Sequence, residues 1–158
     1  MRQKISRRDS LKLGITLGVA AYAGSVEPGG AMAADRTFSK DSESEGGQLW
    51  DRVHGGNGTI TAKRFPFSKA AHPANFLTYD IPPSASEGVH THILDDEEAG
   101  SFDEFYYIVS GEGQMKIDGE NIAVGKGDHV FTPIGISHGI ENTSATTNLK
   151  VFLTFVLR

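Results

Sequence analysis

The stretch GDHVFTPIGISHGIEN, residues 127–142, contains two short apolar runs separated by a proline and a glycine. The runs His129–Thr132 and Ser137–Asn142 are too short for typical helices and are rich in residues that favour strands. Pro133 and Gly135 between them favour a turn. The stretch therefore predicts two strands joined by a tight connection.

The same pattern extends in both directions from this stretch. Short alternating or apolar runs recur, separated by Gly, Pro, Asp and Asn, and the dipeptide Asp118-Gly119 is typical of a hairpin turn. Seven further strands are predicted at Thr59–Arg64, Asn75–Ile81, Gly88–Ile93, Glu104–Ser110, Gln114–Ile117, Asn121–Val124 and Leu149–Leu157. Short strands without helices favour an all-β closed barrel or jelly roll, because these architectures hide strand edges.

The N-terminal part has the features of an export signal. Basic residues precede the apolar run Leu13–Ala23, and the small-residue sequence AMA follows at 31–33. The sequence SRRDSLK at 6–12 is similar to a twin-arginine signal, although Ser10 stands where phenylalanine is usual. We expect a signal peptide over residues 1–33 and export to the periplasm or the exterior. Ordinary secretion and a basic N-terminal helix of the mature fold are the alternatives.

The chain after the signal is acidic and free of cysteine. Residues 34–48 are polar and are expected to form a flexible tether, which leaves one domain at 49–158. The chain after residue 33 has 10 Lys and Arg against 18 Asp and Glu, a net charge of 10 − 18 = −8. Nucleic acid is therefore not an expected partner, and no remaining segment is long and apolar enough to cross a membrane. The absence of Cys excludes disulfides, thiol nucleophiles and thiolate metal sites.

Two of the six histidines, His90 and His92, lie one residue apart in GVHTH, residues 88–92. On a strand they would point to the same face and could share one ion, although a solvent-facing pair is an equally common arrangement. The stretch EFYYIVSG, residues 104–111, adds a carboxylate at the start of the next predicted strand. His138 follows the proline-glycine turn of the opening stretch.

These stretches resemble the two sequence motifs of the cupin family. The second motif has the form Gly, five residues, Pro, one residue, Gly, two residues, His, three residues, Asn. Every spacing is matched by Gly127, Pro133, Gly135, His138 and Asn142.

The first cupin motif is matched with two departures. Its leading glycine normally lies six residues before the first histidine, but Ser84 stands there and Gly88 lies close by. His90, His92, Glu104 and Gly111 correspond to its His-x-His, Glu and Gly, with the expected six residues between the last two. The gap between His92 and Glu104 holds eleven residues, where the family has three or four. Glu97 has the usual spacing from His92 and is the alternative ligand. Glu104 is preferred because an apolar strand and a glycine follow it.

The resemblance covers about residues 49–157. It implies a double-stranded β-helix barrel, the jelly-roll or cupin fold, in which a metal site is formed by His90, His92, Glu104 and His138. Three imidazoles and one carboxylate suit a divalent transition metal and leave open positions in an octahedral ion. We expect manganese or iron, because a protein folded before export takes its metal in the cytoplasm. Nickel, copper, zinc and cobalt are alternatives, as is a barrel that keeps these residues for packing alone.

Other residues are placed near the site by alternation. If Glu104 faces inward, so does Tyr106, whose phenol could then act as an acid, a base or a hydrogen-bond donor. A core aromatic is the simpler interpretation. Phe131, Ile136 and Ile140 are expected to form apolar walls of the pocket.

Two segments are expected to lie on the surface. His54 is in the glycine-rich sequence HGGNG. The acidic insertion 93–103 is expected to be a solvated loop or, alternatively, a lid whose negative charge would disfavour dianions such as oxalate.

Three functions are consistent with the sequence. The favoured one is a metal-dependent enzyme acting on a small oxygen-bearing organic substrate, with dioxygenase, decarboxylase, lyase or isomerase chemistry. The second is an exported protein that binds a metal or a small ligand without catalysis, and the third is a structural barrel. The resemblance also implies a homodimer, with the apolar sequence KVFLTFVL at 150–157 in the barrel wall or at the interface.

Overall fold

The computed structural model describes residues 40, 42–65, 75–97 and 100–158, within the second of two compact units, Phe38–Arg158. The expected signal peptide lies outside the described residues. The described chain is almost entirely β, and its one short helical element is the 3-10 turn η2 (Val53–Gly55). None of the helical structure described here is long and apolar enough to cross a membrane.

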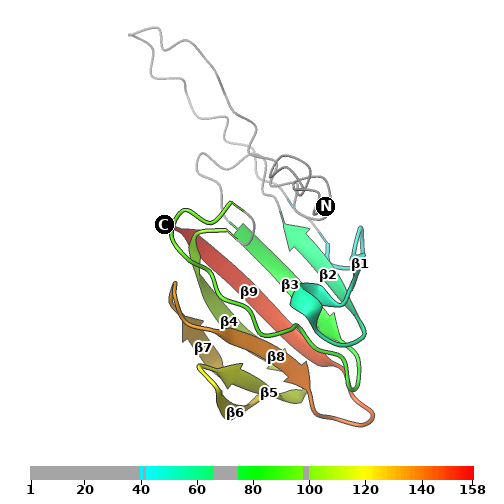
Figure 1. Ribbon diagram of the computed structural model, residues 1–158. Coiled ribbons are helices and arrows are strands. Elements are labelled where there is room, and N and C mark those ends of the chain that lie inside the picture. The colour runs from blue at the N-terminus through cyan, green and yellow to red at the C-terminus, as the bar shows by residue number, and fades with distance from the viewer. Residues whose placement is uncertain (1–39, 41, 66–74, 98–99) are drawn as a thin grey trace, which may run out of the picture. The chain divides into compact units, whose positions relative to one another are not determined.

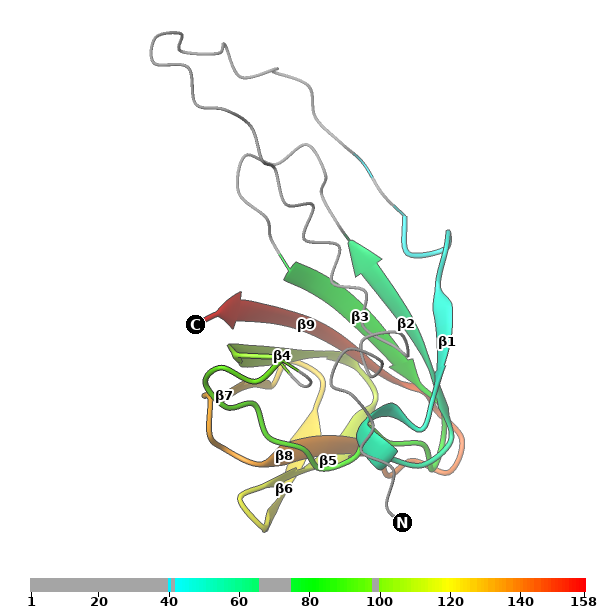
Figure 2. The same ribbon diagram turned by 45° about the horizontal axis from the view of Figure 1, so that its top comes forward.

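Two antiparallel sheets form the jelly roll, as predicted (Figures 1 and 2). The larger sheet has the order β1 (Gln48–Asp51), β2 (Thr59–Phe65), β3 (Asn75–Ile81), β9 (Leu149–Leu157), β4 (Phe102–Ser110) and β7 (His129–Thr132). The smaller sheet has the order β6 (Glu120–Gly125), β5 (Glu112–Ile117) and β8 (His138–Asn142), and it lies below the larger one in Figure 2.

The core lies between the sheets and follows the alternation of each strand. In β9, Leu149, Val151 and Leu153 are fully buried, whereas the residues between them are partly exposed. Alternate side chains of a strand point to opposite faces, so each strand contributes every second residue to the interior. The other buried apolar residues include Ile60, Ala62, Leu77, Tyr79, Ile81, Tyr106, Ile108, Met115, Val124 and Ile140.

Eight of the nine predicted strands are present. The prediction of a strand at Gly88–Ile93 is wrong. This segment is extended but carries only an isolated bridge between His90 and His138, and a second bridge joins Ser86 to Glu141. The register shifts by one residue between the two bridges, so a continuous ladder along β8 cannot form. The strand β1 was not predicted, because QLWD is too short for its alternation to be distinctive.

Glycine backbones hold the extended segment against the turn before β2. A Cβ atom at Gly88 would lie 2.2 Å from the carbonyl oxygen of His54, and one at Gly56 would lie 2.1 Å from that of Ser86. Gly88 N also donates a hydrogen bond to Val53 O at 2.8 Å. No side chain fits at either glycine, because the obstacle is backbone that cannot rotate away.

The substitution Gly88→Ala should therefore lower the free energy of unfolding by about 1–3 kcal/mol, as overpacking of a close contact does. Urea denaturation of the metal-free protein would measure the loss. Gly125→Ala is the matched control, because nothing lies within 4 Å of a Cβ atom at Gly125. Equal denaturation midpoints for the two variants would contradict the proposed backbone contact.

Candidate metal centre

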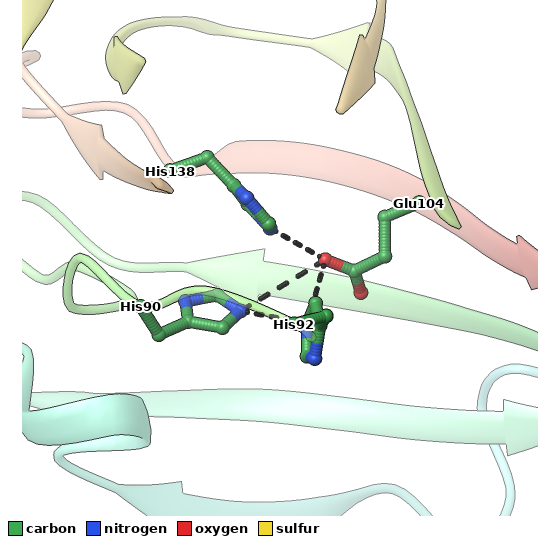
Figure 3. Close-up of side chains that lie close together, drawn as sticks. All are labelled: His90, His92, Glu104 and His138. Carbon is green, nitrogen blue, oxygen red and sulfur yellow. Dashed lines mark hydrogen bonds and ion pairs between the residues drawn. The ribbon is translucent and has the colours of Figure 1, made fainter. Parts of the chain in front are cut away.

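Four side chains from three parts of the chain converge in the interior (Figure 3). Glu104 Oε2, from β4, lies 2.8 Å from His138 Nε2, 3.4 Å from His92 Nε2 and 3.9 Å from His90 Nε2. The Nε2 atoms of His90 and His92 are 3.1 Å apart, and all four donor atoms lie within 4.8 Å of one another. Donors at about 2.1 Å from one ion would be separated by roughly 3 to 4 Å, so the spacing fits a single metal ion.

Backbone carbonyls fix the orientation of two of the imidazoles. His90 Nδ1 lies 3.0 Å from Gly88 O, and His138 Nδ1 lies 2.9 Å from Ile136 O. A carbonyl oxygen only accepts, so each Nδ1 must carry the hydrogen, which leaves Nε2 as the nitrogen that can bind a metal. His138 Nε2 lies 2.8 Å from the Glu104 carboxylate and must give up its own hydrogen when a metal binds. His92 Nδ1 is buried and has no hydrogen-bond partner within the described part of the chain.

The charges of the site are set by burial and by the Glu104 carboxylate. Burial alone would raise the pKa of Glu104, but hydrogen bonds from His138 and His92 outweigh it and hold the pKa far below the usual range. Burial, helped by the nearby His54, lowers the pKa of His90 to about 3. Burial also opposes protonation of His138, but its hydrogen bond to Glu104 raises the pKa above the usual value. An ionised Glu104 and a neutral His90 are in the states that metal ligation requires.

Tyr106 lies where alternation placed it, and it connects Glu104 to a buried carboxyl group that sequence reasoning missed. Its Oη is 2.9 Å from Glu104 Oε2 and 3.0 Å from Glu87 Oε2. Tyr79 Oη donates to Glu87 Oε1 at 3.2 Å. Burial, strengthened by the charge of Glu104, raises the pKa of Glu87 to about 8. The one sequence signal for Glu87 was an acidic residue among small residues just before the histidine pair.

His54 is exposed, as expected, but it also covers one face of a predicted ligand. Its ring stacks on that of His90 with centroids 3.8 Å apart and an angle of 9° between the planes. The ring nitrogens of His54 and His90 and a Glu87 oxygen form a second group within 4.8 Å. No local pattern indicated this contact, because the two histidines are 36 residues apart in the chain and meet only in the folded barrel.

Two other residues predicted for the site, Glu97 and Phe131, do not lie in it. Glu97 is exposed and is outside the group of four donors, so the structure brings Glu104 to the site instead. Phe131 does not wall the pocket: it is 52% exposed and stacks on Phe105, with ring centroids 4.8 Å apart. The reason is register, because Thr132 pairs with Glu104 and the neighbouring residue must therefore face outward.

The two predicted isoleucines lie close to the site in different ways. Ile140 is fully buried in the core and pairs with Met115 of β5. Ile136 is half-buried and orients His138 through its carbonyl oxygen. In the acidic insertion 93–103, Ile93 and Leu94 are exposed. Ser101 Oγ donates a hydrogen bond to Ile93 O at 3.0 Å and so connects the beginning of the insertion with a residue near its end.

Sequence comparisons identify the family. The model of the Cupin domain family matches residues 77–155. An oxalate-binding protein of Thermotoga maritima is 34% identical over 107 residues, which cover 66% of this chain and 82% of that protein.

Structural comparisons agree. The crystal structure of a predicted oxalate decarboxylase from Thermotoga maritima has 31% identity and a TM-score of 0.64, covering 74% of this chain and 97% of that one. A Cupin 2 conserved barrel domain protein from Salinispora arenicola has the same fold, with 17% identity, a TM-score of 0.58 and coverage of 75% and 87%. With its jelly-roll fold, matched motifs and convergent His and Glu side chains, this chain belongs to the cupin family.

Proposed function

We propose that this protein is a metal-dependent cupin enzyme that acts on a small organic substrate with oxygen donors. The observation that carries the proposal is the convergence of three Nε2 atoms and one carboxylate oxygen within 4.8 Å. The residues that would hold the ion are His90, His92, Glu104 and His138. Nitrogen and oxygen donors without sulfur suit manganese or iron, the metals that we favour for a protein loaded before export. Bound there, the ion would act as a Lewis acid toward a substrate oxygen.

The chain itself would supply a proton beside this centre. The Tyr106 hydroxyl has one hydrogen, yet its oxygen lies within hydrogen-bond distance of both Glu104 Oε2 and Glu87 Oε2. If Tyr106 donates to Glu104, Glu87 must provide the hydrogen of the other contact. The raised pKa of Glu87, about 8, is consistent with this count. A protonated carboxyl joined to the site through a phenol is suited to general acid-base chemistry, which supports an enzyme over a passive binding protein.

The signal-like sequence of residues 1–33 supports an exported enzyme, in the periplasm or outside the cell. A homodimer is also part of this proposal, because Phe105, Tyr107 and Phe131 expose an aromatic surface on the outer face of the larger sheet.

The second candidate is a protein that binds a small dicarboxylate without converting it. A relative with 34% identity is named an oxalate-binding protein, and this likeness favours the candidate. Calorimetric titration of the manganese-loaded protein with oxalate, followed by analysis of the recovered ligand, separates the two. Tight binding with unchanged oxalate would favour the binding protein.

Metal content is the first test of the proposed site. The untagged wild-type protein should contain about one equivalent of manganese or iron by mass spectrometry. Glu104→Ala should lose the metal, because it removes the one anionic donor, and a loss of affinity of at least about 10-fold is expected. Glu97→Ala should keep it, because Glu97 is exposed and outside the group of donors. Equal metal content in both variants would exclude Glu104 as the ligand.

The protonated state of Glu87 predicts a pH dependence of stability in the metal-free protein. The pKa of Glu87 is about 8 in the folded chain against an ordinary 4.5, so the folded state keeps a proton that the unfolded state has lost. Rising pH therefore lowers the free energy of unfolding between these two values and has no further effect through Glu87 above about 8. Below about 4.5 the contribution is fully present.

The variant Glu87→Gln cannot titrate, so its stability relative to wild type should increase steadily from pH 5 to pH 8. Urea denaturation of chelator-treated samples at several pH values measures the difference. Glu97→Gln, at an exposed position, should show no such trend relative to wild type. Parallel curves for wild type and Glu87→Gln would show that Glu87 is ionised in the folded protein.

A further inference from the structure

One positively charged side chain, Arg64, projects from the inner face of β2. Ile60 and Ala62 of this strand are fully buried, and Arg64 continues the same alternation. Lys63 belongs to the opposite face, where its Nζ lies 5.5 Å from the centroid of the Phe65 ring. Arg64 is half-buried at the end of this face. Its guanidinium therefore belongs to the interior side of the barrel wall.

Trp50 holds the guanidinium in place. Arg64 Cζ lies 5.1 Å from the centroid of the Trp50 ring, within the range of a cation–π interaction. Trp50 pairs with Ile60 across the strands and packs against the hydrophobic core. Its ring also meets Tyr79 edge to face, at a centroid distance of 6.0 Å. The stacked pair is thus in contact with the tyrosine that donates to Glu87.

The donors of Arg64 are available to a ligand. A guanidinium has five N–H donors in a planar fork that matches a carboxylate. Among the described residues, no side chain or carbonyl accepts a hydrogen bond from Arg64, and no carboxylate forms an ion pair with it. Two other cations of the described chain do form ion pairs: Arg158 pairs with Asp103 at 3.1 Å, and Lys150 pairs with Glu43.

Arg64 and the metal centre face the same interior. The register places Arg64 opposite Leu77, Leu77 opposite Leu153, and Leu153 opposite Tyr106, so Arg64 and Tyr106 share one row of the larger sheet. Three strand spacings, about 14 Å, separate their backbones. Burial and the charges of Glu87 and Glu104 raise the pKa of Tyr79, and the charge of Arg64 acts on it in the opposite direction.

We propose that Arg64, stacked on Trp50, forms a carboxylate-binding subsite that holds one end of the substrate while oxygens at its other end reach the metal centre. The subsite rests on the proposed function and narrows the substrate to a carboxylate with a second oxygen-bearing end. A two-carbon dianion such as oxalate can chelate an ion alone and does not need Arg64. A diacid too long to chelate the ion through both carboxylates leaves one carboxylate free for Arg64.

Trp50 is the one tryptophan of the chain, so its fluorescence reports on the subsite. Manganese-loaded protein is titrated with oxalate, malonate, succinate and glutarate, and with succinamide as the uncharged analogue of succinate. A saturable change in Trp50 emission is expected for at least one of the longer diacids and not for succinamide. Arg64→Gln should weaken that binding at least about 10-fold, because the charge-assisted hydrogen bonds from the guanidinium to the carboxylate are lost.

Lys63→Gln is the matched control, with the same change of charge on the adjacent residue of the opposite face, and it should stay within about twofold of wild type. Oxalate binding should be unchanged in both variants. Diacids that bind Arg64→Gln as tightly as wild type, or that never bind wild type, would overturn the subsite.

Metal content measured on the same samples separates this inference from the proposed function. The subsite is supported if the Arg64→Gln variant retains the metal but loses the change in Trp50 fluorescence on addition of the diacid. Wild type that retains the metal but shows no Arg64-dependent binding overturns the subsite and leaves the metal centre intact. If wild type takes up no metal after reconstitution, the proposed function fails. Arg64-dependent quenching of Trp50 in the metal-free protein then decides the subsite by itself.

Discussion

The burial of the Glu104 carboxylate is the constraint on which the rest of the site depends. An ionised carboxyl is very costly to remove from water unless polar partners replace the water. Here the partners are the Nε2 atoms of His138 and His92 and the Tyr106 hydroxyl. They come from β8, from the extended segment and from β4 itself, so the jelly roll must bring both sheets together before the charge can be accommodated. The same requirement makes the site a place where a divalent cation would be stabilised.

The backbone, rather than the side chains, sets the distance between two of the candidate ligands. His90 N donates to His138 O and His138 N donates to His90 O, both at 2.8 Å, so the two residues form a reciprocal pair. Glycines permit this approach, because a Cβ atom at Gly139 would lie 2.8 Å from Gly88 O. The carbonyls of Gly88 and Ile136 then orient the rings. A centre organised in this way keeps its geometry without an ion, which reduces the ordering required when a metal binds.

The sequence predicted those features that depend on spacing along one strand or motif. The motif containing His138 and the alternation from Glu104 to Tyr106 both placed side chains in the interior, because strand periodicity is local. Phe131 was misplaced because its direction depends on the register between β7 and β4, which local pattern does not specify. Glu87 and His54 were missed for a related reason. Their contacts with Tyr106 and His90 join segments that are adjacent only after the barrel has closed.

The distribution of charge inside the barrel bears on what the chain can recognise. Glu87 and Glu104 are buried carboxyl groups near the centre, and Arg64 is a cation on the inner face of β2, three strands away from β4 in the same sheet. A compact dianion at the metal would lie close to Glu87 and far from Arg64, so its affinity depends on whether Glu87 holds its proton. A ligand with its negative charge at one end meets no such conflict, because that end lies beside the guanidinium. Similarity to a relative named an oxalate-binding protein therefore supports the proposed metal ligands more than it identifies the molecule bound, because our proposal assigns specificity to residues such as Glu87 and Arg64.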